Sequence, residues 1–233
     1  MSTAGYEQSG EWRELPGAGQ VLFTERAHGN LSSVGGERAE QGESARERLR
    51  TTLGVHRLAR GYQVHGAVVR RVEEVEPREP EADERAEADG QATATRGIAA
   101  MVMSADCMPV ALGADGVVAM VHAGWRGLAA GVLEQGVRAV RELGGGEQVL
   151  AIVGPCAGLC CYEVGEEVHA LFSHAHRDGR RIDLRAIAHE RLLAAGARQV
   201  QDVLACTICD ERYFSHRREG ARAGRQAGVA WLS

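Results

Sequence analysis

The chain has 233 residues, of which 44% are hydrophobic and 25% charged, and its formal net charge is −5 at pH 7. These values are typical of a folded globular protein, and the acidic balance disfavours a nucleic-acid partner, which would require a basic face. All 27 of its Lys or Arg residues are arginines, which excludes Schiff-base chemistry and a Walker-type phosphate loop, because both need a lysine.

Residues 1–20 are rich in glycine and polar residues, and we expect a flexible lead-in there. This segment has neither the basic start nor the apolar stretch of a secretory signal, so we expect a cytoplasmic protein. No apolar run is long enough to cross a bilayer, and no membrane partner is expected. The apolar run at residues 21–24 predicts the first strand, and residues 21–233 are long enough to form one domain around a single core.

Residues 44–47 have the form of a capping box, which predicts a helix that runs through Leu53 and ends at Gly54. A strand is expected over residues 67–75. The following stretch, Glu73 to Asp89, is strongly acidic and lacks the apolar periodicity of a packed element. We therefore expect an exposed loop there, without a chemical role.

Two apolar runs, residues 98–103 and residues 117–121, are expected to form strands. The first leads to Cys107 and the second to His122. Residues 114–116 between them have the composition of a hairpin turn, so we expect the two strands to pair and to bring Cys107 and His122 together.

The remaining patterns predict a further set of helices and strands. They favour a helix over residues 127–143, a helix capped by Asp183, and strands over 149–153, 200–204 and 229–232. Because strands and helices do not alternate cleanly, we predict an α+β fold, a single domain with a mixed β-sheet core layered with helices, and not a Rossmann fold.

Three side chains at the ends of strand-like runs form a candidate metal site: His65, Cys107 and His122. Two imidazoles and one thiolate are ligands that zinc favours, and three protein ligands leave a fourth position open, as in catalytic sites. Each residue also has an ordinary structural explanation, as a buried histidine bonded to backbone or as a small apolar cysteine.

Six cysteines occur in the chain, and in a reducing compartment free thiols or metal ligands are more common than disulfides. Cys156, Cys160 and Cys161 form one cluster, and Cys206 and Cys209 form a C-x-x-C pair. A closed zinc site built from both clusters is an alternative, but the first cluster lacks the spacing of a zinc ribbon. The sequence favours thiols packed in the core or in turns.

Several motifs occur in a fixed order along most of the chain. They are QVH at 63–65, ADCMPV at 105–110, HAGWRG at 122–127, GPC at 154–156 with CCYEVG at 160–165, CT at 206–207, and RREG at 217–220 with GRQ at 224–226. Together they resemble the YfiH-like family, which is also named multicopper polyphenol oxidase (laccase-domain) proteins or purine nucleoside phosphorylases.

The resemblance implies zinc bound by His65, Cys107 and His122. It also implies phosphorolysis of purine nucleosides, including adenosine, inosine and methylthioadenosine, with adenosine deamination at the same site. The expected partners are therefore small molecules, namely purine nucleosides and phosphate. Older family names point to copper oxidases, and related bacterial proteins have been linked to peptidoglycan editing, so the names disagree about function.

The chain departs from the family pattern at four positions. Ser104 stands where threonine is common, Leu159 where proline is common, and His216 where tyrosine is common. Glu47 stands where asparagine commonly precedes the arginine that Arg48 matches. A carboxylate beside a phosphate site would repel the anion, so Glu47 is the departure most able to change substrate contacts.

Phosphorolysis requires an anion pocket, and we assign Arg48, Arg126 and Arg225 to phosphate because a guanidinium fork matches two phosphate oxygens. Each of them has a solvated surface charge as its alternative. Deamination requires an acid/base group, for which Asp106 is the first candidate and Glu163 the second. Asp106 has an equal alternative as a structural carboxylate, since neighbouring residues on a strand point to opposite faces.

Two other functions remain open. One is a metal-free hydrolase with Cys107 as nucleophile and His122 or His65 as base. The other is a nucleoside-binding or peptidoglycan-editing protein without turnover. Copper oxidase chemistry ranks lowest, because the additional histidines it needs are scattered at His169, His174 and His176.

Overall fold

A computed structural model describes residues 9–17, 19–32, 37–74 and 85–233. Its strands are β1 Glu11–Leu15, β2 Gly19–Phe23, β3 Arg57–Ala59, β4 Val69–Arg71, β5 Gly90–Thr93, β6 Ile98–Ser104, β7 Met108–Ala114, β8 Val117–Ala123, β9 Leu150–Val153, β10 Arg177–Asp178, β11 Arg181–Ile182, β12 Gln199–Asp202 and β13 Gln226–Leu232. Its helices are α2 Glu37–Leu53, α4 Trp125–Ala129, α5 Val132–Glu142, α6 Glu166–His169, α7 Leu184–Ala194 and α8 His216–Glu219, with 3₁₀ turns at Arg26–His28, His174–His176 and Gly220–Arg222.

Two mixed sheets form the centre of the domain. One has five strands in the order β1-β2-β13-β6-β3, and the other has six in the order β12-β9-β7-β8-β5-β4. Side chains from the two sheets meet in a shared core that includes Val21, Val102, Met120 and Ile152. The sheets therefore pack face to face, as the alternation of inward side chains along each strand requires.

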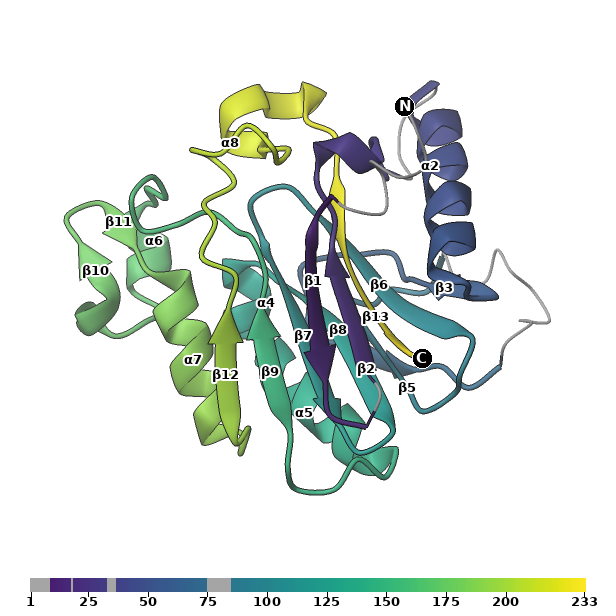
Figure 1. The fold of residues 1–233 in the computed structure, drawn as a ribbon. Helices are drawn as coiled ribbons and strands as arrows, with labels where there is room; N and C mark the ends of the chain where they lie inside the picture. Colours follow the sequence, from purple (N-terminus) through teal and green to yellow (C-terminus); the bar gives the residue numbers. More distant parts are fainter. Residues whose placement is uncertain (1–8, 18, 33–36, 75–84) are drawn as a thin grey trace.

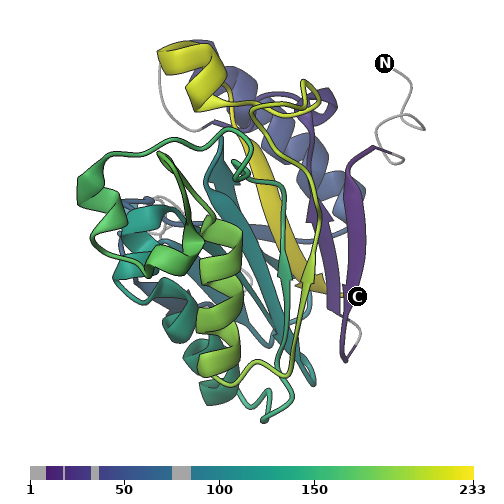
Figure 2. The same ribbon diagram turned by 90° about the vertical axis from the view of Figure 1, so that its left-hand side faces the viewer.

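Helices cover the outer faces of the sheets (Figures 1 and 2). Helix α2 packs through Ala45 and Leu49 on the five-stranded sheet. Helices α5 and α7 pack on the six-stranded sheet, where Leu133 and Leu192 belong to one buried cluster. The central strands are apolar on both faces because each face is covered. The predicted α+β single domain with helices layered on a mixed sheet core is confirmed.

The pairing predicted between residues 98–103 and 117–121 is wrong. Strand β8 instead pairs with β7 across the turn at Asp115 and Gly116. Strand β6 lies in the other sheet, between β13 and β3. The turn was placed correctly, but the strand that enters it is the one after Cys107 and not the one before.

Other boundaries also differ from the predictions. Residues 11–15 form β1, paired with β2, so the flexible lead-in predicted for residues 1–20 is wrong there, while residues 1–8 lie outside the described part.

Helix α2 begins at Glu37, and Ser44 lies inside it rather than at its start. The helix expected over 127–143 is two helices, because Gly131 adopts a left-handed conformation with φ 87° between them. The cap by Asp183 is confirmed, since its side chain accepts from the Ala186 amide.

Among the described residues, no helix is both long and apolar enough to span a membrane.

The contact between α5 and the sheet predicts a large effect of truncating Leu133, which is fully buried. Leu133→Ala should lower the free energy of unfolding by about 2 to 5 kcal/mol, because it removes apolar contacts and leaves a cavity. Leu193→Ala is the matched control, since Leu193 on α7 is 54% exposed and should change stability little. Urea unfolding followed by circular dichroism measures both, and equal shifts would contradict the packing described here.

Candidate active site

A buried carboxylate, Asp89, organises one wall of the site. Its two oxygens accept hydrogen bonds from the backbone amides of Val64 (3.1 Å), His65 (3.0 Å) and Gly66 (2.7 Å). These bonds hold His65 in the left-handed region at φ 61°, which a non-glycine residue adopts only when its surroundings impose it. Burial alone would raise the pKa of Asp89, but its bonds with His122 and these amides hold that pKa below its ordinary value.

The same carboxylate orients His122. Oδ1 of Asp89 lies 2.8 Å from His122 Nδ1, and the His122 amide donates to the Asp89 carbonyl at 2.6 Å. With Nδ1 engaged, Nε2 is left for the site, an arrangement common in histidines that bind metals. Burial lowers the pKa of His122, but the neighbouring Cys107 and Asp89 raise it to about 9.

Cys107 reaches the site from the connection between β6 and β7. Pairing of β7 with β8 sets Pro109 opposite His122, which places Cys107 beside that imidazole. Its Sγ lies 3.9 Å from His65 Nε2. Burial raises the pKa of Cys107, but the imidazoles of His122 and His65 lower it to about 6, so the thiolate is accessible near neutral pH.

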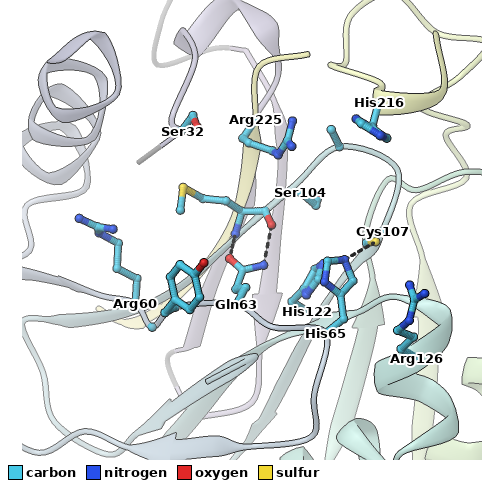
Figure 3. Close-up of a pocket in the computed structure, with 14 residues that line it drawn as sticks. Ser32, Arg60, Gln63, His65, Ser104, Cys107, His122, Arg126, His216 and Arg225 are labelled. Carbon is cyan, nitrogen blue, oxygen red and sulfur yellow. Dashed lines mark hydrogen bonds between the residues drawn. The ribbon is translucent and has the colours of Figure 1, made fainter. Parts of the chain in front are cut away.

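The donor atoms of His65, Cys107 and His122 all lie within 4.8 Å of one another. Figure 3 shows the three side chains gathered on one side of the pocket. Gly124 adjoins them, and a Cβ at that position would lie 3.0 Å from Cys107 Sγ and 3.1 Å from His65 Cδ2. Two nitrogens and one sulfur that converge in this way fit a tetrahedral zinc site with one open position.

These residues open onto a pocket of about 610 Å³, a volume typical of small-molecule sites. It is lined by Ser32, Arg60, Gly61, Tyr62, Gln63, His65, Met103, Ser104, Ala105, Cys107, His122, Arg126, His216 and Arg225. Arg126 lies on the same side as the three donor residues in Figure 3, and Arg60 lies on the other. The pocket therefore combines arginine side chains with three side chains that could hold a metal ion.

Two polar side chains in the wall differ in their role. Gln63 donates to the Met103 carbonyl and accepts from the Met103 amide, both at 2.8 Å, which fastens the His65 loop to β6. Ser104 is buried, and its hydroxyl has no hydrogen-bond partner among the described residues. A buried hydroxyl without a partner in a pocket wall is available to a ligand.

The two residues expected to act as acid or base do not line this pocket. Both carboxylate oxygens of Asp106 are engaged, Oδ1 by the Thr207 hydroxyl at 2.8 Å and Oδ2 by the Arg217 amide at 2.7 Å. The Glu163 side chain is exposed and lies 3.7 Å from Arg180. The geometry favours the structural alternative for Asp106, which holds the loop ahead of Cys107 in its left-handed conformation at φ 92°.

Of the three arginines assigned to phosphate, Arg126 and Arg225 line the pocket, whereas Arg48 is exposed on α2 and is not among the lining residues. Glu47 beside it forms an ion pair with Arg50, 2.6 Å between oxygen and nitrogen, and does not line the pocket either. A phosphate contact by Arg48 stays a prediction.

Sequence reasoning missed Asp89 and Arg60. Asp89 was included in an acidic stretch to which no chemistry was assigned, yet it is completely buried. The signal that could have singled it out is its position directly before a strand, β5. Arg60 is one of 27 arginines, and nothing in the sequence distinguishes it.

Comparison with known proteins agrees with this architecture. A purine nucleoside phosphorylase of Xylella fastidiosa (strain Temecula1) is 38% identical over 94% of this chain and 90% of its own. The purine nucleoside phosphorylase YfiH of Escherichia coli is 37% identical over 73% of this chain and 72% of its own. The crystal structure of YlmD from Geobacillus stearothermophilus superposes with a TM-score of 0.84 at 26% identity, covering 97% of both chains.

Residues 18–233 match the family described as multi-copper polyphenol oxidoreductase laccase. The chain belongs to this family, whose members include the YfiH-named relatives, and the predicted resemblance is confirmed.

The Asp89 network predicts that an isosteric change there weakens metal binding without removing a ligand. Asp89→Asn should lower zinc affinity roughly 10- to 100-fold, because it disturbs both the His65 loop and the His122 imidazole. Asp115→Asn, at an exposed turn, is the control and should bind zinc normally. Competition with a chromophoric chelator measures the affinities, and unchanged binding in Asp89→Asn would refute the orienting role.

Proposed function

We propose that the chain is a zinc-dependent purine nucleoside phosphorylase. The observation that carries the proposal is the convergence of His65, Cys107 and His122 at a pocket that also presents arginines. The names of relatives that align over nearly the whole chain support the same reaction. The nucleosides we propose as substrates are adenosine, inosine and methylthioadenosine.

His65, Cys107 and His122 would hold the metal, and zinc bound there would supply Lewis-acid polarisation of a substrate or water oxygen. The donor set alone also resembles one that copper accepts, but the described residues offer no further histidine cluster of the kind that oxidase centres need. Zinc therefore remains the metal we assign.

Arg126 and Arg225 would bind and orient phosphate, since both line the pocket and keep their charge at any physiological pH. In phosphorolysis a phosphate oxygen forms a bond to the ribose C1′ while the bond from C1′ to the purine nitrogen breaks. The guanidinium groups would place the nucleophile and balance its charge.

The nucleoside would use other parts of the wall. Tyr62 is 57% exposed at the pocket and offers an aromatic face for the purine. The unpartnered Ser104 hydroxyl would hydrogen-bond a polar atom of the nucleoside. For adenosine deamination at the same site a proton-transfer group is needed, and His216 is the lining residue that can serve, in place of Asp106 or Glu163.

A second function, a metal-free cysteine hydrolase, is favoured by one observation: Cys107 Sγ lies within 4.8 Å of a ring nitrogen of His122 and 3.9 Å from His65 Nε2, as a thiol activated by an imidazole would. Chelator-treated protein that keeps its activity and loses it on alkylation of Cys107 would support the hydrolase. Binding of nucleosides without turnover would support a nucleoside-binding or peptidoglycan-editing role.

Products from adenosine distinguish these functions. Zinc-loaded protein should form adenine and ribose 1-phosphate only when phosphate is present. Inosine is the product expected from deamination, which does not need phosphate. Chromatography resolves adenine, inosine and hypoxanthine. Cys107→Ala should reduce all products to background, because it removes a metal ligand. Full activity in that variant, or no product from the wild type, would refute the proposal.

The phosphate site predicts a selective kinetic effect. Arg126→Gln and Arg225→Gln should each raise the KM for phosphate roughly 10-fold or more, because a charge-assisted hydrogen bond is lost, with a smaller change in the KM for the nucleoside. Arg138→Gln, at an exposed position of α5, is the control. Arg48→Gln decides the role of Arg48: a matching rise would place it at phosphate, and an unchanged KM would exclude it.

A further inference from the structure

Four cysteines outside the described pocket converge on one another. Cys160 and Cys161 lie on the loop between β9 and α6, and Cys206 and Cys209 lie on the loop after β12. The four sulfur atoms all lie within 4.8 Å of one another. Cys209 Sγ is 3.0 Å from Cys161 Sγ and 3.6 Å from Cys160 Sγ.

Packing of free thiols does not account for this arrangement. A free cysteine is usually buried as a small apolar side chain, but Cys160 and Cys209 are exposed. A disulfide would join the sulfurs in separate pairs, whereas here each sulfur is close to all three others. Sulfurs around a tetrahedral zinc ion are about 3.8 Å apart, given zinc–sulfur bonds of about 2.3 Å. Two of the separations here, 3.0 and 3.6 Å, are somewhat shorter than that, and all of them are within 4.8 Å, so small shifts of the side chains would admit the ion.

The backbone around Cys206 is arranged to stabilise a thiolate. The Gly158 amide donates to Cys206 Sγ at 3.3 Å, which ties the first loop to the second. Amides directed at the first sulfur of a C-x-x-C turn are a feature that a metal-binding knuckle requires, because the ligand is the thiolate.

Glycine at position 158 lets the two loops approach closely. A Cβ there would lie 3.3 Å from Cys206 Cβ and 3.4 Å from Cys160 Sγ. The two loops are also joined by backbone bonds, from the Cys156 amide to the Ala205 carbonyl at 3.3 Å and from the Thr207 amide to the Cys156 carbonyl at 3.0 Å.

We propose that Cys160, Cys161, Cys206 and Cys209 bind a second metal ion, zinc, in a closed tetrathiolate site that cross-links these two loops. Four protein ligands leave no position for a reactant, so the site is structural rather than catalytic. This inference does not depend on the proposed phosphorylase activity.

The four-cysteine site would also stabilise the segment of the pocket that contains Cys107. Thr207, between the two cysteines of the second loop, donates to Asp106, which directly precedes Cys107. The other oxygen of Asp106 accepts from the Arg217 amide, and Arg217 Nη1 donates to the Glu163 carbonyl on the first loop at 2.8 Å. A metal that fixes both loops thereby fixes the anchor of Cys107.

Metal content tests the proposal. Protein purified under reducing conditions with zinc supplied should carry about two zinc ions per chain, measured by elemental analysis together with iron and copper. Cys160→Ser and Cys209→Ser should each reduce this to about one, and because both side chains are exposed the substitutions leave no cavity. Cys156→Ala is the matched control, since Cys156 is the cysteine of this region outside the four, and it should keep about two.

Cobalt gives a second readout that does not depend on counting ions. Cys107→Ala removes the sulfur of the pocket, so sulfur-to-cobalt charge-transfer bands from that variant must arise from the four-cysteine site. The bands should be strong, and they should weaken in Cys107→Ala/Cys209→Ser. Zinc content in Cys209→Ser equal to that of the wild type, absence of the bands in Cys107→Ala, or iron in place of zinc would overturn the proposal.

Discussion

The site depends on the hydrogen bonds that the Asp89 carboxylate accepts. It accepts from three consecutive amides of the His65 loop and from the His122 imidazole, and it is completely buried. An unpaired carboxylate there would be strongly destabilised, so the loop and the imidazole must both be in place for it to remain charged. Through one side chain, His65 on its loop and His122 on β8 acquire a common orientation. The hydrogen bonds of Asp89 thus fix the positions of two of the three candidate metal donors.

The packing of the two sheets positions the third candidate donor, Cys107. Register between β7 and β8 fixes Cys107 beside His122, while β6 leads into Cys107 from the opposite sheet. The connection that contains Asp106 and Cys107 therefore crosses from one sheet to the other at the edge of the core. Gln63, on the loop that carries His65, forms two hydrogen bonds with Met103 on β6. The pocket lies where the chain crosses from one sheet to the other, and residues that belong to or adjoin both sheets form its walls.

Much of this could be predicted from the sequence. The convergence of the three candidate donors was predicted because each follows an apolar run, and their role as metal ligands stays a prediction. The α+β class followed from the irregular order of elements. The pairing of β6 could not be predicted, because β6, β7 and β8 are all apolar on both faces and their composition does not specify a neighbour. Asp89 resembled the acidic residues before it, and its burial and its position directly before β5 are what distinguish it. The four cysteines were judged by spacing along the chain, whereas β9 and β12, which pair in parallel, bring the two loops together at one end of the sheet.

His65 occupies a conformation that glycine or asparagine would adopt with less strain, since its φ is 61°. Replacement by either residue would relieve a local cost of about 1 kcal/mol or more and delete an imidazole at the same time. Under the proposed metal-binding role, selection for turnover and selection for thermal stability would therefore act in opposite directions at this position. A screen for stability alone would be expected to replace this histidine early. The strained φ of His65 thus marks a position where stability and the proposed function conflict.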